Sequence, residues 1–99
     1  MPLPLIKRLE TTTCKTILER IKARAVKKFG EKWIAGIVRE YVAIAQEQGD
    51  TSATTLSRRP HIERAFSNGS CNADTLIMLA GSVGCKFQIV CTVEEVENL

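Results

Sequence analysis

Six polar side chains between residues 58 and 68 could recognise an anion or the edge of a base. They are Arg58, Arg59, His61, Arg64, Ser67 and Asn68. Side chains of these types form hydrogen bonds with phosphate oxygens and with the edges of base pairs in a DNA groove. The chemistry that this segment predicts is therefore recognition by hydrogen bonds and charge, without bond making.

The apolar residues of this segment set its rotation. Ile62, Ala65 and Phe66 are spaced for one side of a helix, which predicts a short helix over residues 60–67. We expect Ile62 and Phe66 to be buried. At 100° per residue, Arg64 then points almost directly away from Ile62, toward solvent.

Each polar side chain can be given a role on such a helix. Arg64 has the planar fork that suits a guanine edge, while Asn68 could bond adenine or form the turn. His61, near the helix start, could contact a phosphate or a base. Arg58 and Arg59 are expected to precede the helix, where free backbone N–H groups already favour an anion, so we assign them to phosphates. The alternative is that all three arginines are ordinary solvated surface residues.

The sequence shows no signature of an enzyme, a cofactor or a metal site. It has no glycine-rich phosphate loop and no Ser/His/Asp set, and its one histidine follows a proline. The four cysteines, at positions 14, 71, 85 and 91, are irregularly spaced, so we expect reduced thiols with no metal and no required disulfide. We predict a protein that is not an enzyme and uses no cofactor.

Charge is distributed unevenly along the 99 residues. Residues 1–45 hold ten Lys/Arg and four Glu, whereas residues 46–99 hold four Lys/Arg and seven Asp/Glu. The basic half suggests a surface that faces a polyanion, although a solvated helix rich in lysine would give the same count. No apolar run is long enough to span a membrane and no export signal is recognisable, so we expect a cytoplasmic protein.

Prolines and glycines, which interrupt helices, divide the chain into an arm and one domain. We expect an extended N-terminal arm over residues 1–10 and a single helical domain over residues 11–99. Within the domain, two long helices span 11–49, a helix-turn-helix with its following helix spans 50–84, and a strand with an acidic tail spans 85–99.

Two boundaries in the second half depend on local chemistry. A short two-turn helix is expected within residues 50–58, ending before Arg59 because a residue before proline leaves the helical region. Pro60 then suits the first position of the next helix. Alternation of apolar and polar residues over 85–92 predicts a short strand.

Residues 59–89 resemble the C-terminal half of Cro/lambda-repressor-like (Xre-type) domains, closest to the antidote proteins of toxin–antitoxin modules. In that group the reading helix has a form like Arg-x-x-Leu-x-x-Ala-Leu-Ser, followed by a glycine-rich turn and a Thr-Leu/Val helix. The matching positions here are Arg59, Ile62, Ala65, Phe66, Ser67, the turn from Asn68 to Asn72, Thr75, Leu76, Leu79, Ala80, Gly84, Lys86 and Phe87. The chain departs from the family at "TSATTLSRR", which lacks the usual turn glycine.

This resemblance implies a mainly α protein, a lambda-repressor-like helix-turn-helix bundle of about five helices with one short C-terminal β-strand. It implies a sequence-specific duplex-DNA-binding transcriptional regulator, acting as a homodimer. In its antitoxin form it would be the autorepressor of a toxin–antitoxin pair, with a cognate toxin as partner. The alternative is an interaction or adaptor protein that keeps the fold without reading DNA and holds its partner with the long helices.

Overall fold

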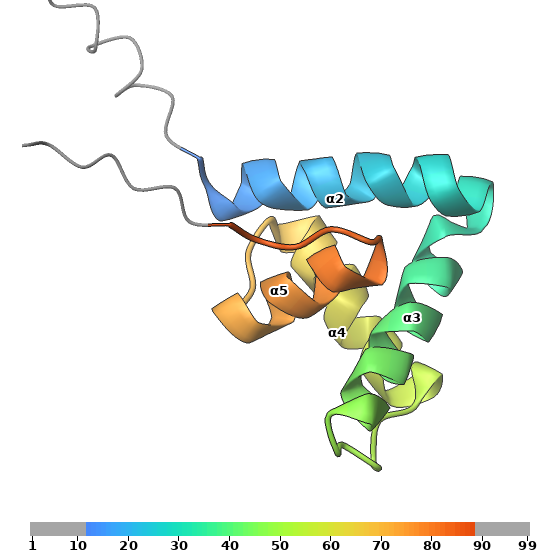
Figure 1. Ribbon diagram of the computed structural model, residues 1–99. Helices are drawn as coiled ribbons and strands as arrows, with labels where there is room; N and C mark the ends of the chain where they lie inside the picture. The colour runs from blue at the N-terminus through green and yellow to red at the C-terminus, as the bar shows by residue number, and fades with distance from the viewer. Residues whose placement is uncertain (1–11, 89–99) are drawn as a thin grey trace, which may run out of the picture.

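The computed structural model describes residues 12–88, and these residues fold into four α-helices and one 3-10 helix. In chain order they are α2 (Cys14–Phe29), the 3-10 helix η1 (Gly30–Lys32), α3 (Trp33–Glu47), α4 (Thr55–Asn68) and α5 (Ala73–Ser82). The long helix α2 lies along one side, α3 turns sharply away from its end, and α4 and α5 fill the angle between them (Figure 1). The expectation of a mainly α fold is confirmed.

The two long helices expected in residues 11–49 are α2 and α3. The Thr13 side chain accepts a hydrogen bond from the Thr16 N–H at 3.2 Å and so caps the start of α2. Gly30, at φ 75°, ends it in a conformation that L side chains rarely adopt. Gly36 then lets α3 approach Phe29 closely, since a Cβ atom on Gly36 would lie 2.4 Å from the ring.

Helix α3 is the centre of the core and packs against each of the other three α-helices. Its residues Ile37 and Val38 are completely or almost completely buried. The core is mainly aliphatic, as the low aromatic content indicates. Its members are Leu18, Ile21, Ala25, Ile37, Val38, Tyr41, Val42, Ala45, Ala53, Ile62, Ala65, Leu79, Ala80 and Val83.

The helix that carries the candidate site begins earlier than expected. Helix α4 starts at Thr55 and continues through Pro60 to Asn68, so the separate helix expected within residues 50–58 is wrong. A capping box explains the earlier start, because Thr54 and Ser57 each bond the other's backbone N–H. Pro60 withholds one N–H from the carbonyl four residues earlier, but this side of the helix is exposed to water.

The expected count of about five helices is corrected by the same finding, since residues 50–54 form turns and a short extended stretch. Within the expected strand, residues 85–88 have no regular secondary structure. Residues 89–92, the N-terminal arm at 1–10 and the acidic tail lie outside the described residues. Between residues 12 and 88, no helix combines the length and the apolar character that crossing a bilayer requires.

Candidate nucleic-acid interface

The rotation of α4 about its axis is fixed by its buried side. Ile62 is 0 % exposed and Ala65 is also buried. Phe66 is half-buried, with its ring edge-on to Trp33 at a centroid distance of 5.1 Å. The expected burial of Ile62 is confirmed, and Phe66 is packed against the core without being enclosed by it.

The opposite side of α4 presents polar side chains to solvent. Arg64, Ser67 and Asn68 are all exposed, as their angular distance from Ile62 predicts. The helix ends at Gly69, whose φ of 68° lies in the left-handed region. Three of the six candidate side chains therefore share one accessible surface at the C-terminal half of α4.

Helix α2 adds two lysines to this surface that the sequence reasoning did not include. Lys15 and Lys22, with the acidic Glu19 between them, line a hollow of about 240 Å³ together with Leu18 and residues 66–69. The Lys15 side chain passes close to Gly69, where an added Cβ would lie 3.2 Å from it. The sequence could have indicated that these two lysines lie together, because a spacing of seven residues, about two helical turns, places both on one side of a helix.

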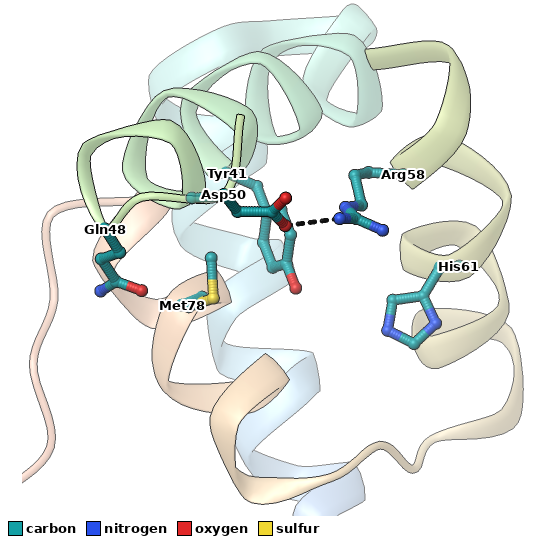
Figure 2. Close-up of a pocket in the computed structure, with 7 residues that line it drawn as sticks. Tyr41, Gln48, Asp50, Arg58, His61 and Met78 are labelled. Carbon is teal, nitrogen blue, oxygen red and sulfur yellow. Dashed lines mark hydrogen bonds and ion pairs between the residues drawn. The ribbon is translucent and has the colours of Figure 1, made fainter. Parts of the chain in front are cut away.

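Arg58 and Arg59 do not precede the helix, so the expectation that free N–H groups surround them is wrong. Both lie within α4, and the capping box at its start already occupies the N–H groups of Thr54 and Ser57. The Arg58 guanidinium pairs with the Asp50 carboxylate at 2.5 Å, as Figure 2 shows. The Arg59 guanidinium lies 3.5 Å from the Glu63 carboxylate, one turn along the helix.

His61 and Arg58 face a hollow of about 420 Å³ between α3, α4 and α5 (Figure 2). It is lined by Tyr41, Ala45, Gln48, Asp50, Arg58, His61 and Met78. His61 Nε2 lies 3.3 Å from the Thr75 hydroxyl at the start of α5. The histidine is thus in contact with the start of α5.

Asp50 organises the turn between α3 and α4. Its carboxylate accepts hydrogen bonds from the backbone N–H and the hydroxyl of Ser52, at 3.2 and 2.7 Å. The hydroxyl bond from Ser52 and the bond from Arg58 hold the pKa of Asp50 below its usual value. Because His61 bonds a threonine and Asp50 bonds an arginine, the two do not form the acid–imidazole pair of a hydrolytic triad.

The thiols at positions 14, 71 and 85 are free and half-buried. Burial, together with the neighbouring Cys14 thiol, raises the pKa of the Cys71 thiol to about 11. Cys91 lies outside the described residues. Within residues 12–88, no three His, Cys, Asp or Glu side chains are grouped as a metal site would need, and the absence of a metal stays a prediction.

Comparison of the chain with protein-family models, with curated proteins and with solved structures gives no match. The resemblance to Xre-type domains therefore stays a prediction. The case for a function depends on the geometry of α4 and of the helix beside it.

Proposed function

We propose that this protein is a sequence-specific transcriptional regulator that binds duplex DNA by placing α4 in the major groove. The observation that carries the proposal is the complete burial of Ile62. It fixes Arg64 on the outward side, with Ser67 and Asn68 exposed beside it. An arginine on such a surface can bond the O6 and N7 acceptors of guanine, and an asparagine can bond adenine.

Phosphate contacts would flank this reading surface. Lys15 and Lys22 stand beside the C-terminal end of α4, and the side chain of Arg59 is half-exposed next to Glu63. Arg58 is held by Asp50 and His61 by Thr75, so each would reach a phosphate only by leaving its present partner. We therefore assign Arg58 and His61 a smaller part in binding than Arg64.

The regulator would act as a homodimer in the cytoplasm. One helix reads only a few base pairs, and a dimer doubles the contacts across a two-fold site. In the antitoxin form of this proposal, the protein represses its own operon and binds a cognate toxin. No cofactor, metal or catalytic group is required for this function.

The proposal is tested by titrating the wild-type protein and Arg64→Ala against a duplex selected from random sequence and a scrambled one. Arg64→Ala should cost about 1–3 kcal/mol on the selected duplex and reduce the preference between the two. Arg59→Ala is the matched control, because it removes the same charge from the same helix. It should weaken binding to both duplexes alike and lower the salt slope by about 0.9.

An equal loss on both duplexes for Arg64→Ala would refute base reading by α4. A second function, that of an adaptor that does not read DNA, is favoured by the ion pairs of Arg58 and Arg59 and by the lack of a separate helix over 50–58. In that case the long helices α2 and α3 would hold a protein partner. Selection would then return no preferred duplex.

A further inference from the structure

A second group of cations lies on the flank of α2 that faces away from α4. Its members are exposed and are here called the basic face: Arg20, Arg24, Lys27, Lys28 and Lys86. Four of them come from α2, and the fifth comes from the segment after α5, which runs alongside α2 (Figure 1).

Two hollows join these cations into one surface. Arg24, Lys27 and Lys28 line a hollow of about 400 Å³ with Val83 and Gly84, at the end of α5. Arg20, Arg24 and Lys86 line a neighbouring hollow of about 560 Å³. Arg24 borders both hollows, so the two lie next to each other along α2.

Among residues 12–88, no acidic residue lines either hollow of the basic face. The ion pairs found among residues 12–88 involve Arg58 and Arg59, and neither touches this surface. The C-terminal ends of α2 and α5 point toward it, but each carries only about half a negative charge, against five cations.

We propose that the basic face binds the phosphate backbone of duplex DNA without reading sequence, as a second DNA-binding surface separate from α4. From Arg20 to Lys28 the helix rises about 12 Å, at about 1.5 Å per residue. That length covers roughly three phosphates of one strand, which are about 3.4 Å apart along the duplex axis. The charge density of the surface thus suits a polyanion with closely spaced charges.

The burial of the other side of α2 argues against a lipid partner. Amphipathic helices that bind membranes insert an apolar side below the headgroups. Here that side, formed by Leu18, Ile21 and Ala25, is buried in the core. The cations of the basic face stay exposed, and phosphates on a rigid polyanion are their complement.

The test compares two double variants of the full chain that remove the same charge from different places. Arg24→Gln/Lys27→Gln alters the basic face, while Lys32→Gln/Arg39→Gln removes one lysine and one arginine that are exposed and line neither hollow. Affinity for a random-sequence duplex is measured from about 50 to about 200 mM salt. Circular dichroism checks that both variants remain helical.

The basic-face variant should lower the salt slope by about 1.8, at about 0.9 for each phosphate contact, with at least about tenfold weaker binding at low salt. Lys86→Gln, which lies outside the helices, should lower it by about 0.9 and gives an answer if the double variant fails to fold. An equal change in both double variants would overturn the proposal, since net charge alone would then explain binding. Tighter binding to phosphatidylserine vesicles than to the duplex would overturn it as well.

This proposal does not depend on base reading by α4, and the two can fail separately. If α4 does not read bases, Arg64→Ala leaves the preference between sequences unchanged, while the basic-face variant still shows a lower salt slope. If the basic face does not bind phosphates, the slope is retained while Arg64→Ala still removes the preference.

Discussion

Replacing Ile62 by alanine tests the packing on which the orientation of α4 depends. The side chain is 0 % exposed, and the change removes three carbon atoms from the core. At about 0.8 kcal/mol for each buried methylene, the transfer loss is about 2.4 kcal/mol. The cavity left behind adds to it, so the expected loss in the free energy of unfolding is about 2–5 kcal/mol. That is a large fraction of the roughly 5–15 kcal/mol typical of a domain.

The same helix offers a matched control in Leu56, whose side chain is 86 % exposed. Leu56→Ala should change stability by no more than about 0.5 kcal/mol. Urea denaturation followed by circular dichroism gives both values, and a loss of 3 kcal/mol corresponds to a fall of about 12–24 °C in Tm. Equal and small effects of the two substitutions would refute the buried position of Ile62 and, with it, the outward position of Arg64.

Three further substitutions test local features of the fold. Gly36→Ala places a Cβ 2.4 Å from the Phe29 ring and should destabilise the protein by about 1–3 kcal/mol. Gly81→Ala, whose nearest contact is at 3.4 Å, should be neutral or stabilising by up to about 1 kcal/mol. If Gly36→Ala caused no loss of stability, the close approach of α2 and α3 would be contradicted. The pKa of Asp50 is lowered in the folded state, so its contribution to stability is present above its ordinary value of 3.8 and is lost as pH falls below it. Acid unfolding of Asp50→Asn should therefore lack that part of the pH dependence, and identical acid profiles would refute the assignment. Pro60→Ala restores a backbone donor inside α4 and should stabilise by about 1–2 kcal/mol in thermal unfolding, and a loss would indicate that the helix does not continue through residue 60.

Much of the helical framework follows from patterns that depend on neighbouring residues. The apolar spacing along α2 and α3 identifies both helices, and glycine at positions 30 and 49 places their ends within a few residues. The buried side of α4 is predicted correctly because Ile62 and Ala65 recur at helical spacing. These features are local, and tertiary contacts do not overrule them.

The start of α4 could not be predicted by the same rules. The residue before a proline usually leaves the helical region, but Arg59 stays helical. The capping box at Thr54 and Ser57 and the burial of Ala53 together favour a helix that begins before the proline. Two short-range preferences compete here, and only the packed structure shows which one is stronger.

The positions of the candidate site residues on α4 could be predicted from the sequence, but their contacts with other segments could not. The outward positions of Arg64, Ser67 and Asn68 follow from helical geometry alone. The pairing of Arg58 with Asp50 depends on how the turn after α3 folds back, and the approach of Lys15 to Gly69 depends on the packing of α2 against α4. Such contacts join residues far apart along the chain, so periodicity carries no information about them.

The position of Trp33 has a practical consequence for spectroscopy. It is the single tryptophan of the chain, half-buried, with Phe66 at its edge and the Lys22 ammonium 5.3 Å from its ring centroid. The polarity around the indole is thus set jointly by the end of α4 and by the flank of α2 that stands beside it. Its fluorescence emission will therefore respond to any movement of α4 against α2, and it can report ligand binding or unfolding at this surface without an added label.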